Sequence, residues 1–212
     1  MIFSWPGEDL FEHGRGVALI GECLFPQEIS YYNALLGELE GESRNWWRVA
    51  AALHDIGKAH KCYQETIRKK PNFRCHEFFS AYYIWEALEA TPRTRATLAL
   101  TVMLHHHAMN RFDDCIRNLR KFEPVEEVAD YLMRFSTWLD VRFRPLQSSI
   151  INIAEIMRNV DWKIYKIAVI GVGPLVVADH IISAKRGNPS MLTREISNEI
   201  QHRLNSCINL TS

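Results

Sequence analysis

The sequence has no excess of charge of either sign. Its 212 residues include 25 lysines and arginines and 25 aspartates and glutamates, so the formal net charge is zero. A protein that binds nucleic acid through a global electrostatic field is usually basic. Any nucleic-acid role of this chain therefore has to depend on a local site or on a partner.

Glycine and proline are also scarce, with 10 and 8 residues respectively. Hydrophobic residues make up 47% of the chain and charged residues 24%, which is ordinary for a globular protein. This composition excludes a disordered or collagen-like chain. The sequence contains no internal repeat and no linker, and we expect one domain over residues 1–212.

No cysteine pair has the C-x-x-C spacing. The number of cysteines is odd and they are far apart, which favours free thiols in a reducing cytoplasm over a disulfide framework. The first residues lack a basic segment followed by an apolar stretch, so no signal peptide is predicted. The five cysteines are Cys23, Cys62, Cys75, Cys115 and Cys207.

No apolar run is long enough to cross a membrane. The longest, Ile167–Ala178, has 12 residues and includes Pro174, whereas a membrane-spanning helix needs about 20. We expect this run to be buried in a cytoplasmic protein that does not associate with membranes.

The hydrophobic periodicity is helical almost throughout, and no stretch alternates as a strand would. The predicted fold class is therefore all-α, in one compact domain. Ser43 is the expected N-cap of one helix, Gly57 its C-terminal stop, and Pro92 and Pro174 mark helix boundaries. The predicted helices are Leu10–Leu24, Glu28–Glu40, Ser43–Ile56, His76–Ala90, Arg93–His107, Val125–Leu139, Ser149–Asn159, Trp162–Ile170, Pro174–Lys185 and Leu192–Leu204.

A possible metal site begins with the segment Leu53-His-Asp-Ile-Gly-Lys58. A carboxylate has two oxygens and can bridge two cations, whereas a neutral imidazole offers one nitrogen. His54 and Asp55 can both reach a cation at the edge of a helix. Lys58 follows Asp55 by three residues and would lie on the same side, where its charge can stabilise a phosphate. A solvated lysine at a polar helix end is the structural alternative.

Three consecutive histidines, His105, His106 and His107, follow an apolar helix. A helix dipole accounts for one cation at a C-terminus but not for three imidazoles. Asp179 lies within an apolar helix, where an acid is costly to bury unless it is paired or bound to metal. His13 lies on a predicted helix and His76 at the start of another, and each by itself is more often a structural histidine than a ligand.

A second arrangement of metal ligands is also open. His60 and Cys62, followed by Cys75 and His76, form two pairs that could bind structural zinc, although their spacing differs from that of common zinc fingers. In that arrangement His76 would bind the structural zinc and would not be available to the metal site around His54 and Asp55.

The order His13, His54-Asp55, Lys58, His76, His105-His106 and Asp179 resembles the HD superfamily of metal-dependent phosphohydrolases. It is most similar to the stand-alone HD nuclease of type I CRISPR interference. The resemblance covers residues from about 10 to 186. The chain departs from the family in having three consecutive histidines rather than two, so His106 and His107 are an alternative to His105 and His106.

The resemblance implies two divalent metal ions that share Asp55. The first ion would be held by His13, His54, Asp55 and Asp179, and the second by Asp55, His76, His105 and His106. Imidazole-rich sites favour Mn, Fe, Co, Ni or Zn over Mg, which prefers oxygen ligands. The metal identity stays open.

The resemblance also implies an activity and partners. The activity is cleavage of single-stranded DNA supplied by a separate CRISPR helicase subunit and a guide-RNA surveillance complex. A phosphohydrolase acting on nucleotides or cyclic nucleotides would use the same ligands, and a non-catalytic scaffold could keep the metal for stability. The Gly-Tyr-Pro triplet of cyclic-dinucleotide enzymes does not follow the histidine run.

Overall fold

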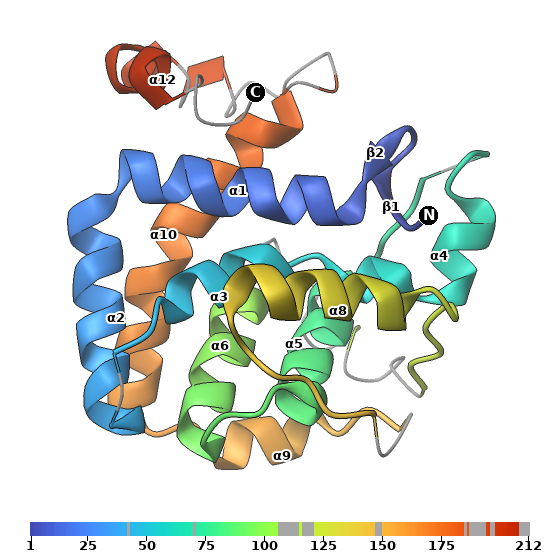
Figure 1. Cartoon of the computed structure of the whole chain (residues 1–212), viewed down its shortest axis with the longest axis horizontal. Helices are drawn as coiled ribbons and strands as arrows, with labels where there is room; N and C mark the ends of the chain where they lie inside the picture. The colour runs from blue at the N-terminus through green and yellow to red at the C-terminus, as the bar shows by residue number, and fades with distance from the viewer. Residues whose placement is uncertain are drawn as a thin grey trace.

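The structure is a computed structural model that describes residues 1–41, 43–69, 71–105, 115, 121–146, 150–184, 186, 194–195 and 198–207. The described chain is mainly helical, which confirms the predicted fold class (Figure 1). Its helices are α1 Leu10–Leu24, α2 Pro26–Glu40, α3 Trp46–Leu53, the 3-10 helix η1 Ile56–Ala59, α4 Lys61–Thr66, α5 His76–Ala87, α6 Pro92–His105, α8 Val128–Leu139, α9 Ile153–Arg158, α10 Trp162–Ala184 and α12 Gln201–Cys207.

A short β-hairpin precedes the helices, and the expectation of no strand is wrong here. Strand β1, Phe3–Trp5, pairs antiparallel with β2, Glu8–Asp9. Gly7 in the connecting turn has φ +84, a conformation that favours glycine. Strands of three and two residues are too short to show an alternating pattern, so the sequence gives no signal for them.

The helices pack in two crossed directions around α10. In Figure 1, α1, α3 and α8 run across the molecule, while α2, α5 and α6 run crosswise to them. Helix α10 packs against α1, α2 and α6, and α1 also packs against α3. The largest fully buried side chains include Trp46, Trp47, Tyr32, Tyr82 and Phe78. Burial of such rings removes large apolar areas from water and stabilises this arrangement.

Helix α10 is one continuous helix, whereas the sequence predicted a break before Pro174. A proline inside a helix removes one backbone hydrogen bond. Three residues before Pro174, the carbonyl of Gly171 accepts a hydrogen bond of 3.1 Å from Trp47 Nε1, which joins α3 to this part of α10. By length and mean hydropathy (1.9), α10 could cross a membrane, but half of its most apolar window is buried in this domain. We interpret it as the central core helix.

Several predicted helix boundaries are wrong. The N-cap of α3 is Asn45, whose side chain accepts a 3.0 Å hydrogen bond from the Arg48 amide, and not Ser43. Pro92 begins α6. Helix α4 was not predicted, and the ends of α9 and α12 differ from the predicted ones.

Gly57 lies in η1 and does not terminate α3, which ends at Leu53. A Cβ at Gly57 would lie 2.2 Å from the carbonyl oxygen of His76. The Gly57 amide also donates a 2.8 Å hydrogen bond to Ser80 Oγ on α5. The missing side chain therefore lets η1 approach α5 closely.

The cysteine prediction is wrong for four of the five residues. Two disulfides form, Cys23–Cys207 and Cys75–Cys115, with Cα–Cα distances of 5.8 and 5.6 Å. Their partners are distant in sequence, so only the tertiary fold brings them together. Cys62 is free and exposed. Because Cys75 is bonded to Cys115, the alternative zinc arrangement with His60 and Cys62 is not formed.

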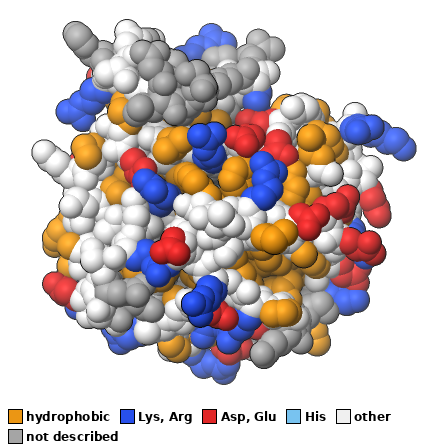
Figure 2. Space-filling model, viewed as in Figure 1, with side chains coloured by type: hydrophobic (Ala, Val, Ile, Leu, Met, Phe, Trp, Pro, Cys, Tyr) orange, Lys and Arg blue, Asp and Glu red, His pale blue; other side chains and the backbone are white. Residues whose placement is uncertain are grey.

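The face of the molecule in Figure 2 carries basic and acidic side chains interspersed with one another. This distribution agrees with the zero net charge of the sequence. The described part of that face shows no continuous basic field of the kind that binds nucleic acid without a local site.

We predict that Gly57→Ala destabilises the protein by about 1–3 kcal/mol, because the added Cβ overlaps the α5 backbone. Thermal unfolding followed by circular dichroism measures the effect. Gly173→Ala is the matched control, since a Cβ there meets nothing within 4 Å. Because alanine has a higher helix propensity than glycine, this variant should be as stable as the wild type or slightly more stable. Equal melting temperatures for Gly57→Ala and the wild type would contradict the close approach.

Candidate metal centre

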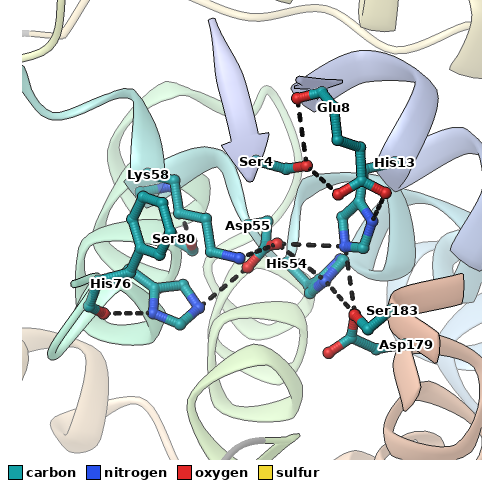
Figure 3. A network of polar contacts seen from close by, with 12 residues as sticks. Ser4, Glu8, His13, His54, Asp55, Lys58, His76, Ser80, Asp179 and Ser183 are labelled. Atoms are coloured by element: carbon teal, nitrogen blue, oxygen red, sulfur yellow. Dashed lines mark hydrogen bonds and ion pairs between the residues drawn. The ribbon is translucent and has the colours of Figure 1, made fainter. Parts of the chain in front are cut away.

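Side chains from six segments of the chain converge on one buried centre (Figure 3). They come from α1, the turn after α3, η1 and the start of α5, and from the end of α6 and the second half of α10. Each of these side chains belongs to a residue that is at most 6% exposed. They are His13, His54, Asp55, Lys58, His76, His105 and Asp179, which are all the predicted site residues within the described part of the chain.

The close packing of α1 on α3 brings the first two histidines together. A Cβ at Gly14 would lie 2.2 Å from the carbonyl oxygen of Ala52, so only glycine permits this approach. As a result the rings of His13 and His54 are 5.3 Å apart between centroids. The histidine that precedes Gly14 therefore reaches the Asp55 turn.

Asp55 has its two carboxylate oxygens directed at different partners. Oδ2 lies 2.6 Å from Lys58 Nζ and 3.2 Å from His13 Nε2. Oδ1 lies 2.9 Å from His76 Nε2. Burial acts to raise the pKa of Asp55, but the charge of Lys58 and hydrogen bonds with His13 and His76 hold that pKa well below its usual range. Asp55 is therefore an ionised carboxylate with one oxygen facing each side of the centre.

Asp179 supplies the second carboxylate. Its Oδ1 lies 3.2 Å from His13 Nε2 and accepts a 3.1 Å hydrogen bond from Ser183 Oγ, one turn further along α10. Its Oδ2 lies 4.0 Å from His105 Nε2. Burial acts to raise the pKa of Asp179, and its contact with His13 lowers that pKa well below the usual value.

Three of the histidines are oriented in the same way. The Nδ1 atoms of His54, His76 and His105 lie 2.7, 2.6 and 2.8 Å from the backbone carbonyl oxygens of Ala51, Phe73 and Val102. Because a carbonyl can only accept, each Nδ1 carries the proton and each Nε2 is left as an electron-pair donor in the neutral ring. The Nε2 atoms of the three rings lie within 4 Å of the carboxylates of Asp55 or Asp179.

His13 is oriented by a carboxylate that the sequence analysis missed. Its Nδ1 lies 3.2 Å from Oε1 of Glu8 on β2, and Glu8 Oε2 accepts hydrogen bonds from Ser4 Oγ (2.6 Å) and Arg186 Nε (2.8 Å). Burial acts to lower the pKa of His13, but hydrogen bonds with the carboxylates of Asp179, Asp55 and Glu8 raise it to about 10, so a cation that binds this ring has to displace the proton on Nε2. Burial likewise acts to raise the pKa of Glu8, and its contact with His13 lowers it to about 2.

These donors fit a divalent cation. His13, His54 and Asp55 offer ligand atoms within 4.8 Å of one another, and so do His54, His105 and Asp179. His54 Nε2 is buried and has no hydrogen-bond partner among the described residues, which leaves its electron pair available. Burial lowers the pKa of His105 to about 3, so this ring is neutral, as a metal ligand must be.

The grouping differs in part from what the family resemblance implies. His105 lies with His54 and Asp179, and not with His76 on the opposite side of Asp55. His106 and His107 lie outside the described residues, so the choice between the two histidine pairs stays a prediction. Glu77, next to His76, was also missed, and its buried Oε2 lies 3.3 Å from His76 Nδ1. Carboxylates that orient ligand histidines are common around metal sites, but nothing in the sequence separates such residues from other acids.

Comparison with known proteins identifies the family of this arrangement. Residues 7–186 match the family model described as "Cas3, HD domain". The chain belongs to the Cas3 HD-domain family. The matched range contains every predicted site residue from His13 to Asp179, together with Glu8 and Arg186.

One curated relative of this Cas3 HD-domain chain is the CRISPR-associated endonuclease Cas3-HD of Methanocaldococcus jannaschii. The two are 38% identical over 122 residues, an alignment that covers 53% of this chain and 48% of the relative. The match therefore spans about half the length of that relative. A solved structure, the CRISPR-associated Cas3 HD domain protein of the same organism, has a TM-score of 0.52 at 20% identity. That comparison covers 84% of this chain and 100% of the solved chain, and it supports the fold.

We predict that Mn²⁺ raises the melting temperature of the metal-free protein and that EDTA reverses the shift. A ligand at one hundred times its Kd stabilises by about 2.7 kcal/mol. Asp179→Asn should remove most of this shift, because it weakens a carboxylate ligand. Asp130→Asn, an exposed acid on α8, is the control and should keep the full shift. A full Mn²⁺ shift in Asp179→Asn would contradict its place in the centre.

Proposed function

We propose that this chain is a metal-dependent nuclease that hydrolyses phosphodiester bonds of single-stranded DNA in CRISPR interference. The observation that carries the proposal is the buried Asp55 carboxylate, with one oxygen toward His13 and the other toward His76. A carboxylate placed in this way can bridge two cations. Membership of the Cas3 HD-domain family and the similarity to a relative named as a CRISPR-associated endonuclease support the same function.

The centre would hold two divalent metal ions that share Asp55. We assign His13, His54 and Asp179 to the first, and His76 with two histidines of the run at 105–107 to the second. The position of His105 near Asp179 makes it a possible ligand of the first ion as well. When bound, such ions activate water as a nucleophile and stabilise charge on the attacking and leaving oxygens of a phosphodiester. The imidazole-rich donors favour Mn, Fe, Co, Ni or Zn over Mg.

Within the protein, Lys58 is the residue suited to the reacting phosphate. Lys58 is 5% exposed, and its ammonium lies 2.6 Å from Asp55 Oδ2. A fixed cation in a buried site can stabilise developing negative charge or donate a proton to the leaving oxygen. The neighbouring hydroxyls already have structural partners: Ser80 accepts from the Gly57 amide and Ser183 donates to Asp179. No covalent step on a serine is therefore required.

The proposed partners are single-stranded DNA, a separate CRISPR helicase subunit and a guide-RNA surveillance complex. The zero net charge agrees with this division, since a chain without a basic field binds a strand through a local site or with the help of a partner. A phosphohydrolase of nucleotides or cyclic nucleotides remains the second function that the same ligands would allow. A substrate panel with added Mn²⁺, Ni²⁺ or Mg²⁺ tests both: single-stranded DNA, duplex DNA, RNA, nucleotides and cyclic nucleotides. Preferential turnover of nucleotides would overturn the nuclease proposal.

We predict that Asp55→Ala abolishes phosphodiester cleavage while the helical circular dichroism spectrum is retained. The reason is that Asp55 supplies both the shared ligand and the partner of Lys58. Cleavage of labelled single-stranded DNA in Mn²⁺ measures the effect, with Asp130→Asn as an active control. Cleavage at the wild-type rate in Asp55→Ala would mean that the chemistry does not use this centre.

We predict that Lys58→Ala slows turnover by roughly 100-fold, the effect of removing one group that stabilises charge in the transition state. Its metal content, measured on the purified protein, should change much less, because Lys58 is not a ligand. Lys163→Ala, on the exposed surface of α10, is the control. A loss of metal as large as the loss of activity would instead assign Lys58 a structural role.

A further inference from the structure

Two cationic side chains, Lys58 and Arg186, each contact both a residue of the metal centre and an aromatic ring. Lys58 Nζ lies 2.6 Å from Asp55 Oδ2 and 4.9 Å from the centroid of the Phe73 ring. The Arg186 guanidinium has a nitrogen 3.1 Å from His13 Nδ1, and its central carbon is 5.4 Å from the centroid of the Trp5 ring. One face of the centre is therefore flanked by two ring–cation pairs.

The two rings are neighbours although they come from distant parts of the chain. Trp5 belongs to β1 of the hairpin, and Phe73 to the segment before α5. Their centroids are 6.4 Å apart with an interplanar angle of 49°, and the Phe73 ring lies 6.3 Å from the His76 ring. Both residues are only partly buried. The aromatic pair thus forms part of the rim of the centre and is not enclosed in the core.

Three exposed cations lie on the segment that carries Phe73. Arg68, Lys69 and Arg74 are exposed on the segment between α4 and α5, and the Arg68 guanidinium lies 5.9 Å from the Phe3 ring of β1. Exposed cations next to aromatic rings are the combination that binds single-stranded nucleic acid, since rings stack on bases and cations contact phosphates. This local group of cations supplies positive charge near the centre, although the net charge of the whole chain is zero.

We propose that Trp5 and Phe73 form a subsite for an unpaired nucleobase whose attached phosphate lies toward the metal centre. The proposal rests on the nuclease function above and specifies how its substrate is selected. Stacking on a ring needs an exposed base face, which a single strand offers and the interior of a duplex does not. The subsite therefore discriminates against duplex DNA without reading sequence, because every base has such a face.

The described part of the chain contains another aromatic pair, which is exposed and serves as a control. Trp162 and Tyr165 at the start of α10 stack with centroids 5.5 Å apart and an interplanar angle of 12°, and Lys166 Nζ lies 5.0 Å from the Trp162 ring. The pair has the same chemistry as the rim. Its ring contacts within the described residues are with each other and Lys166, so it has no contact with the centre.

The test is binding of a fluorescein-labelled oligo(dT) of about 20 nucleotides, followed by anisotropy in EDTA so that no cleavage occurs. Trp5→Ala and Phe73→Ala should each weaken binding about tenfold, the effect of losing one stacked base. Trp5→Phe and Phe73→Tyr keep a ring and should retain wild-type affinity within about twofold. Trp162→Ala should bind as the wild type does, and a hairpin duplex should bind equally to all variants.

Circular dichroism and the Mn²⁺-induced shift in melting temperature establish that each variant keeps its fold and its metal centre. Unchanged oligo(dT) affinity in the double variant Trp5→Ala, Phe73→Ala would overturn the subsite. So would a wild-type protein that binds oligo(dT) no more tightly than the duplex, or an equal loss in Trp162→Ala. A last outcome would also overturn the proposal. If Trp5→Ala binds oligo(dT) with wild-type affinity, but dTMP displaces the oligonucleotide less well than from the wild type, the rim binds free nucleotides and not the strand.

These results are separable from the nuclease proposal. A wild-type protein that cleaves no phosphodiester in Mn²⁺ would overturn the function, while binding in EDTA still decides the subsite. Cleavage of single-stranded DNA at the wild-type rate and KM in the double variant would overturn the subsite alone.

Discussion

The burial of the Asp55 carboxylate is the constraint on which the centre depends. An ionised carboxylate in a protein interior is costly unless charges and hydrogen-bond donors compensate it. Here the compensation comes from Lys58 in η1, His13 in α1 and His76 in α5. These elements can meet only where Gly14 and Gly57 remove the side chains that would hold the backbones apart. The position of one charge therefore determines how several helices pack.

The histidines show how the backbone prepares a site for a cation. His54, His76 and His105 each donate from Nδ1 to the carbonyl oxygen three residues earlier in the chain. Each bond is local, so it selects the tautomer and the ring orientation without help from another element. The ligand atoms are thus directed before any ion binds, which lowers the ordering cost of binding. His13 differs, because the distant Glu8 fixes its orientation.

The sequence predicted the centre better than its surroundings. Asp179 was identifiable because an acid at an apolar helical position needs a partner. His13 was identified only through the order of motifs that resembles the HD superfamily, although the bounds of its helix α1 are those predicted from periodicity. Glu8 was missed because an acid in a two-residue strand carries no pattern. The disulfides join residues that only the tertiary fold brings together, which local propensity cannot predict. The continuity of α10 through Pro174 was missed because proline is common in the first turn of a helix, and the sequence was read that way.

The N-terminal hairpin has a consequence for handling the protein. Ile2 is fully buried, and its backbone exchanges hydrogen bonds with the hydroxyl of Tyr131 on α8. The next few residues supply Trp5 to the rim and Glu8 to His13. Deleting the first nine residues would leave all the histidines and aspartates of the centre in the polypeptide. The shortened protein would nevertheless lack the Glu8 carboxylate that aligns His13. Low activity measured on that protein would therefore not represent the activity of the intact chain.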